Sequence, residues 1–388
     1  MKRVYTAPRF DIGQIIRQQS DFTSNSGQFT AHQKRMLGAL ADCRTAALGR
    51  HKIACTDCGS IQIAYNSCRN RNCPKCQNRH SDLWINARSA ELLPVSYFHL
   101  VFTLPYELNL LCLHHPGVMY GLLFQSAWYA VNKLGKDHRW LGAQLGMVAL
   151  LHTWGSNLSL HPHVHCMVPA GGLDQKGNWK SSKSKGSYLF NRGVMGLVFR
   201  ARYVKLLRKA IAKGVLPPVP DQLFKTLFTK EWITYAKRPF RGPQQILNYI
   251  GRYSHKIAIT NHRIVKVTPD SVFFKYKNYR KNGQAQLMKL SKQEFVRRFA
   301  THIIPHKFVR IRHYGILSNR NKKEALLAAR KALGVAQILQ QAKSQPPVLP
   351  ENHYPHYCPC CQKVTVHLLI DVLPAIRGSP EIITHMKH

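Results

Sequence analysis

Three histidines occupy alternate positions in the segment HPHVHCMV, residues 161–168, inside an otherwise apolar run. Successive side chains of an extended strand point to opposite faces, so His161, His163 and His165 share one face. Two such residues lie about 6.5–7 Å apart along the strand, and both imidazoles can therefore converge on one divalent ion. The segment predicts a strand that presents histidines to a metal, with a polar pocket lined by histidines as the alternative.

Two tyrosines lie four residues apart in RGPQQILNYIGRYSHKIAI, residues 241–259. Gly242-Pro243 predicts a helix start, and Tyr249 and Tyr253 then share one face, one turn apart. A tyrosine hydroxyl has a pKa near 10 and needs a nearby cation or metal to attack a phosphate. The helix therefore indicates a phosphoryl-transfer centre, with a core role for Tyr253 as the alternative. The polar stripe of this helix consists of Gln245, Tyr249, Arg252 and Lys256.

Paired cysteines mark a metal module near the N-terminus. Cys55-x2-Cys58 is followed by fourteen residues and then by Cys73-x2-Cys76. Two such pairs predict one tetrahedral structural zinc site. Four further residues could form a second site or replace one of these ligands: Cys43, His51, Cys68 and His80. The loops also carry cations suited to phosphate contacts, namely Arg69, Arg71 and Lys75.

A third cysteine pair, Cys358-x2-Cys361, lies near the C-terminus with His353 and His356 beside it. It could form a metal knuckle, but the sequence offers it no evident partner pair. The role of residues 346–388 is therefore left open.

The charge balance of the whole chain points to a polyanionic partner. The 388 residues include 57 Lys and Arg against 17 Asp and Glu, a net charge of +40, spread along the chain. Apolar segments are interrupted by prolines and charges, so no membrane span is expected. The N-terminus lacks an apolar signal core, and we expect a cytoplasmic protein. Eleven cysteines in that compartment are expected to be metal ligands or buried thiols.

The two motifs together resemble a known family. His163-Val164-His165 resembles the histidine-apolar-histidine (HUH) motif of endonucleases that nick single-stranded DNA, and Tyr249-x3-Tyr253 resembles their two-tyrosine signature. From about Lys34 to about Lys331 the chain resembles the insertion-sequence ninety-one family of rolling-circle transposases. The segments that carry this resemblance are CRNRNCPKCQ (68–77), HTWGSNLSLHPHVHCMVPAGG (152–172), YIGRYSHKIAITNHRI (249–264) and FVRIRHYGILSNR (308–320).

The resemblance implies a reaction and its residues. His163 and His165 would bind Mg²⁺ or Mn²⁺, with Gln245 or His161 as the third ligand, and the two tyrosines would be the nucleophiles. Such transposases cut one strand at transposon ends and keep the 5′ phosphate on tyrosine. No GxxxxGK[ST] loop occurs in the chain, so strand separation would need a host helicase or replication machinery. The alternatives are a replication initiator, a relaxase and a non-catalytic zinc-dependent DNA-binding protein.

These sequence patterns predict an α+β fold with four regions. Residues 1–90 would form a zinc-binding DNA-recognition domain, and 93–265 an HUH nuclease domain with a central, mainly antiparallel sheet. Residues 97–105 are expected to form a strand, and 106–150 helices. Residues 266–345 would form a basic DNA-binding extension, with a hairpin at Asn282-Gly283, and 346–388 a tail. Further cations expected to contact DNA are Arg252, Lys256, Arg310 and Arg312.

Overall fold

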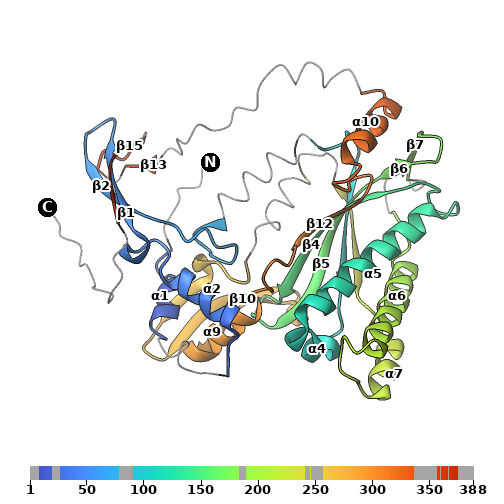
Figure 1. The fold of residues 1–388 in the computed structure, drawn as a ribbon, viewed down its shortest axis with the longest axis horizontal. Helices are drawn as coiled ribbons and strands as arrows, with labels where there is room; N and C mark the ends of the chain where they lie inside the picture. Colours follow the sequence, from blue (N-terminus) through green and yellow to red (C-terminus); the bar gives the residue numbers. More distant parts are fainter. Residues whose placement is uncertain are drawn as a thin grey trace.

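A five-stranded antiparallel sheet organises the larger part of the molecule (Figure 1). Its strand order is β12-β4-β5-β3-β8, and each neighbouring pair is antiparallel. The α+β fold with a mainly antiparallel sheet is therefore confirmed. The strands are β3 (Tyr97–Thr103), β4 (Gly146–Trp154), β5 (Leu160–Pro169), β8 (Thr234–Phe240) and β12 (Ile311–Gly315). The computed structural model describes residues 8–19, 27–77, 89, 91–182, 189–240, 245, 257–335, 356–358, 360–365 and 367–374.

Helices cover one face of this sheet, as Figure 1 shows for α5 and α6. Val164 and Cys166 of β5 point to this face and join its core, which also contains Phe124 of α5 and Phe199 of α6. This burial of apolar side chains holds the sheet and its strands in register. The helices on this side are α4 (Asn109–His114), α5 (Pro116–Lys136), α6 (Arg192–Ala212) and α7 (Asp221–Thr229).

The opposite face of the sheet carries the histidines. The alternate residues of β5, including Met167, point here and pack with Tyr97, Leu150 and the helix α10 (Lys322–Ala332) through Leu326. His163 and His165 share this face, because their neighbours Val164 and Cys166 lie in the core on the helical side. The strand and its predicted facing are thus confirmed.

The strand β4 was not expected from the sequence, since residues 106–150 were predicted to be helical throughout. Helices do fill 109–114 and 116–136, but the chain forms β4 from Gly146 to Trp154. Its first eight residues are all buried. A strand that is apolar on both faces shows no alternation, and periodicity alone does not distinguish it from a buried helix.

A second packing unit combines the N-terminal helices with the segment after residue 257. Ile12 of α1 and Leu37 of α2 share one core with Phe274 and Phe295. The side chain of Gln33 donates a hydrogen bond to the carbonyl of Ala300 at 2.9 Å. Parts of the ranges 1–90 and 266–345, expected as separate regions, therefore pack together, whereas β12 and α10 of the second range belong with the main sheet. The elements are α1 (Ile12–Arg17), α2 (Ala31–Ala41), β9 (Ile264–Val267), β10 (Ser271–Asn278), β11 (Gln284–Ser291) and α9 (Lys292–Thr301).

A small three-stranded sheet joins a segment of the N-terminal module to a segment near the C-terminus. Its order is β15-β1-β2, with β1 (Arg50–Cys55), β2 (Ile61–Tyr65) and β15 (His367–Leu373), and Figure 1 shows β15 beside β1 and β2. Residues 367–373, within the segment expected as a separate tail, thus pair with the N-terminal module. The remaining short elements are β6 (Gly171–Leu173), β7 (Trp179–Ser181), β13 (His356–Tyr357), β14 (Val364–Thr365), and the 3₁₀ turns η2 (Ala46–Leu48), η3 (Tyr106–Leu108), η4 (Asn261–Arg263) and η5 (Tyr279–Lys281).

None of the helices in the described ranges combines the length and the apolar character that a bilayer span requires.

Candidate active site and cysteine clusters

Three histidines meet on the face of the main sheet opposite α5 and α6, and two of them, His152 and His165, are buried. His152 of β4 lies directly opposite His163 of β5, and His165 is two residues further along β5. The potential ligand nitrogens of the three rings all lie within 4.8 Å of one another. The ring of His165 lies 4.5 Å from that of His152 and 4.9 Å from that of His163, measured between centroids. Three imidazoles at this separation fit a single divalent ion.

Hydrogen bonds fix which nitrogen each β5 histidine offers. His163 donates from Nδ1 to the carbonyl oxygen of His161 at 2.7 Å, which leaves the lone pair on its Nε2. Nδ1 of His165 lies 2.9 Å from Nε2 of His99, a buried histidine of β3. Such partners orient a ligating imidazole and set its tautomer. The structure therefore makes Nε2 the candidate ligand atom of both His163 and His165.

The third histidine of the cluster, His152, was missed in the sequence. The candidates named there were His161 and Gln245. His161 is exposed and lies outside the cluster, although its ring lies 5.2 Å from that of His163 and its carbonyl accepts from His163. Gln245 is also exposed. His152 was missed because no strand was predicted between residue 105 and the histidine segment, so residue 152 had no predicted strand partner. The turn signal Gly155-Ser156-Asn157 could have revealed a hairpin that pairs residue 152 with residue 163.

The predicted nucleophiles Tyr249 and Tyr253, with Arg252 and Lys256, lie outside the described residues.

The loop between β4 and β5 is held by the second packing unit. Nε2 of His302 donates to the carbonyl of Leu158 at 3.2 Å, and Arg298 donates to the carbonyl of Asn157 at 3.4 Å. Burial lowers the pKa of His302 to about 4, so its imidazole is neutral at physiological pH. The backbone N–H of Lys277, in β10, donates to Oγ of Ser156 at 2.7 Å. These contacts place the β10–β11 hairpin beside the hairpin that carries the histidines.

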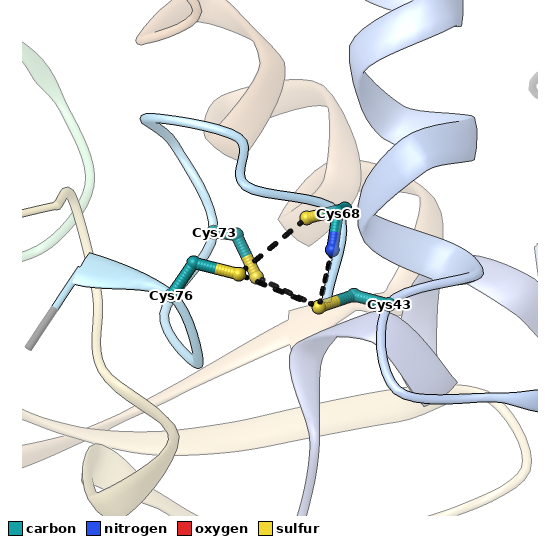
Figure 2. A group of neighbouring side chains, drawn as sticks. All are labelled: Cys43, Cys68, Cys73 and Cys76. Carbon is teal, nitrogen blue, oxygen red and sulfur yellow. Dashed lines mark hydrogen bonds between the residues drawn. The ribbon is translucent and has the colours of Figure 1, made fainter. Parts of the chain in front are cut away.

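Four cysteines converge in the N-terminal module, as Figure 2 shows for Cys43, Cys68, Cys73 and Cys76. The sulfur of Cys43 lies 3.6 Å from that of Cys76 and 3.5 Å from that of Cys73, and Cys68 lies 3.8 Å from Cys76. A tetrahedron with Zn–S bonds of 2.3 Å has sulfurs about 3.8 Å apart. Contacts with the thiols of Cys68 and then Cys73 lower the pKa of Cys43 to about 7. The geometry fits a four-cysteine zinc site.

The predicted grouping of Cys55 and Cys58 with Cys73 and Cys76 is therefore wrong. Cys43 and Cys68, named as possible replacements, complete the site of Cys73 and Cys76. Cys55 and Cys58 lie instead with Cys358 and Cys361, so the tail pair does have a partner. Spacing in the sequence predicts that cysteine pairs close in the chain share one metal. The observed grouping of Cys55 and Cys58 with Cys358 and Cys361 depends instead on the long-range pairing of β1 with β15. His51 belongs to neither cluster, and His80 and His353 lie outside the described residues.

Several cations expected to contact DNA have partners inside the protein. Arg71 donates to the carbonyls of Phe308 at 2.8 Å and Pro305 at 2.9 Å, and Lys75 forms an ion pair with Asp11 at 2.5 Å. These two side chains hold the cysteine module to its neighbours. Arg69 is exposed and is the cation of this loop that we retain for DNA contact.

The other two of these cations in the described residues have different surroundings: Arg312 lies on the helical side of the main sheet, whereas Arg310 lies beside Trp154 and His302. The guanidinium of Arg312 lies 4.4 Å from the ring centroid of Phe124, a cation–π contact. Burial lowers the pKa of Arg310 to about 10, which still leaves it charged at neutral pH. Arg312 is thus used partly for packing, and DNA contact by both residues stays a prediction.

Comparisons with known proteins agree with these features. Residues 146–325 match the family model described as "Putative transposase", and residues 15–104 match "Transposase zinc-binding domain" of the IS91 type. The chain is 36% identical over 389 residues to "Putative transposase y4qJ" of Sinorhizobium fredii, covering 95% of this chain and 97% of that protein. It is 28% identical over 318 residues to "Transposase for insertion sequence element IS801" of Pseudomonas savastanoi pv. phaseolicola, covering 76% of this chain and 72% of that protein.

The fold, the cysteine module and these matches define a DNA transposase with a zinc-binding domain. The chain belongs to the IS91 family of transposases. Its substrate is therefore DNA, and the four cysteines of Figure 2 lie within the matched zinc-binding domain.

Proposed function

We propose that this transposase nicks and rejoins single-stranded DNA at the ends of its element through 5′-phosphotyrosine intermediates. The observation that carries this proposal is the cluster of His152, His163 and His165 on the sheet face opposite α5 and α6. It lies in the segment that matches the transposase family, and the charge of +40 suits a nucleic-acid substrate.

The three histidines would hold a divalent ion, which we propose to be Mg²⁺ or Mn²⁺. A bound ion would supply positive charge to polarise the scissile phosphate. The three histidines offer nitrogen ligands only, and Mn²⁺ accepts nitrogen ligands more readily than Mg²⁺, so Mn²⁺ fits the cluster better. Gln245 is not needed as a third ligand. His99 and the carbonyl of His161 keep the β5 imidazoles in the ligating orientation.

In the proposed reaction, the hydroxyl oxygen of Tyr249 or Tyr253 attacks the phosphorus atom. A tyrosine O–P bond forms, the bond from phosphorus to the 3′ oxygen breaks, and a proton equivalent to the one lost by the phenol converts the departing 3′ oxygen to a hydroxyl. The phosphotyrosine keeps the energy of the broken bond, so a free 3′ hydroxyl can reverse the step without a nucleotide. Two tyrosines allow one to hold the first end while the other cleaves the next. Host helicase or replication would separate the strands.

Replacing both tyrosines by phenylalanine tests this chemistry against a binding-only role. The combined Tyr249→Phe and Tyr253→Phe variant is expected to lose all detectable nicking of a labelled single strand, because no hydroxyl remains to attack. Its DNA affinity should stay within a few-fold of the unmodified chain, since phosphate contacts dominate binding. Each single variant should still nick but fail to join two ends. Undiminished nicking by the combined variant would rule out both tyrosines as nucleophiles.

The β10–β11 hairpin is our candidate for guiding the strand to the histidines. Tyr279 at its tip is 77% exposed, and Lys275 and Lys277 on β10 are also exposed. The hairpin touches the β4–β5 loop through Lys277 and Ser156. An exposed aromatic ring with cations beside it is typical of single-strand binding by base stacking.

Tyr279→Ala is expected to weaken binding of single-stranded DNA by roughly 5- to 150-fold, because one stacked base is worth about 1–3 kcal/mol. Tyr279→Phe keeps the ring and serves as the matched control, with affinity close to that of the unmodified chain. Fluorescence anisotropy at one fixed salt concentration measures both. Equal affinity of the alanine and phenylalanine variants would exclude stacking at this position.

A further inference from the structure

We propose that Cys55, Cys58, Cys358 and Cys361 form a second structural zinc site, which joins the C-terminal segment to the N-terminal module. Their four sulfur atoms lie within 4.8 Å of one another. Cys358 and Cys361 lie outside both family matches, since the zinc-binding domain match ends at residue 104 and the transposase match ends at residue 325.

The sulfur separations fit zinc and not disulfides. Sγ of Cys55 lies 3.9 Å from that of Cys361, and Sγ of Cys58 lies 3.8 Å from that of Cys358. These values are close to the edge of about 3.8 Å expected for a tetrahedral Zn–S₄ site. A disulfide requires about 2.05 Å between sulfurs, and all four residues are free thiols.

Each pair of cysteines lies in a tight turn, and the carbonyl of the first cysteine of the pair accepts the hydrogen bond that closes this turn. In the first, the N–H of Gly59 donates to the carbonyl of Cys55 at 2.9 Å. In the second, the N–H of Gln362 donates to the carbonyl of Cys358 at 2.9 Å. The side chain of Gln62 also donates to Sγ of Cys358 at 3.4 Å, a bond that would stabilise a thiolate ligand.

The sheet that carries the site has little apolar packing of its own. Its strands β1 and β15 pair from Arg50–Leu373 to Cys55–His367. Ile61 is 66% exposed, Ile63 50% and Leu369 62%. A small sheet with exposed apolar side chains on its strands needs another source of stability, and structural zinc supplies folding free energy directly. We infer that zinc at this site holds the two ends of the chain together.

Zinc stoichiometry of single and combined cysteine variants tests this site. All chains would be full length and carry His163→Ala and His165→Ala, so that zinc at the histidine cluster is not counted. We expect two zinc ions per chain by elemental analysis, one after Cys58→Ser and one after Cys358→Ser. The combination of both should still bind one, because the two cysteines serve the same ion. The exposed Cys360 lies in the same turn outside the cluster, so Cys360→Ser should keep two.

Retention of two ions by Cys358→Ser would overturn the proposal, and so would a loss of both ions in the combined variant. If a serine variant fails to fold, Cys58→His and Cys358→His replace it, because imidazole remains a zinc ligand. With Co²⁺ as the probe, each histidine variant should bind two ions and show a changed visible spectrum for one of them. Spectra identical to that of the unsubstituted chain would exclude these cysteines as ligands. None of these readouts depends on DNA cleavage.

Discussion

His152→Ala is expected to abolish DNA cleavage as fully as His163→Ala or His165→Ala, although His152 lies on another strand. The three imidazoles form one cluster, with ligand nitrogens within 4.8 Å of one another, and removal of any one leaves an incomplete ligand set. A metal stabilises charge at the phosphate by several kcal/mol, so we expect cleavage to slow by about 10³-fold or more. DNA affinity should change by only a few-fold, because phosphate contacts elsewhere provide it.

His161→Ala is the matched control for this experiment. It lies on the same strand as His163 and His165, but it is exposed and outside the cluster, and alanine keeps the carbonyl that accepts from His163. Its cleavage rate should stay within a few-fold of the unmodified chain. Single-turnover cleavage of a labelled single strand with Mn²⁺ compares the variants. Wild-type cleavage by His152→Ala would remove His152 from the site, whereas loss of cleavage in His161→Ala would show that the effect is not confined to the three clustered histidines.

Cys43→Ser is expected to release one zinc ion and to unfold the unit formed by α1, α2 and α9 at lower temperature. Cys43, Cys73 and Cys76 are buried in the core of this unit beside Leu37 and Phe295. Loss of the metal leaves three thiols in that core without their common partner. We expect a fall of several kcal/mol in the free energy of unfolding, or about 10 °C in Tm, by calorimetry.

Cys112→Ser is the control for that substitution. Cys112 is equally buried, but it belongs to α4 and lies in the core on the helical side of the main sheet, outside both clusters. The Cys112→Ser protein should retain its zinc. Its free energy of unfolding should fall less, by about 1–3 kcal/mol, because a buried hydroxyl replaces a thiol. Unchanged zinc content after Cys43→Ser would contradict the four-cysteine site of Figure 2.

Local sequence patterns were sufficient where a structure depends on near neighbours. The alternation of His163 and His165 with Val164 and Cys166 predicted both the strand and the face that carries the histidines. Asn282-Gly283 likewise marked the hairpin of β10 and β11, and both residues adopt positive φ. These features follow from the period of a strand and from turn chemistry.

Features that depend on distant pairing were not predictable in this way. His152 belongs to a strand buried on both faces, which has no alternating pattern. Cys55 and Cys58 lie next to cysteines that follow about 300 residues later in the sequence, because β1 pairs with β15. Nor does charge alone distinguish Arg71, which binds backbone carbonyls, from the exposed Arg69. Each of these outcomes is decided by tertiary packing.

Covalent capture of DNA provides the decisive observation on the proposed chemistry. The full chain is incubated with Mn²⁺ or Mg²⁺ and labelled single-stranded DNA from the ends of its own element, then run on a denaturing gel. Transfer through phosphotyrosine predicts an adduct that survives denaturation and maps by mass spectrometry to Tyr249 or Tyr253. Tight binding of the correct ends with no adduct at either tyrosine would contradict it and favour a protein that binds DNA without cutting it.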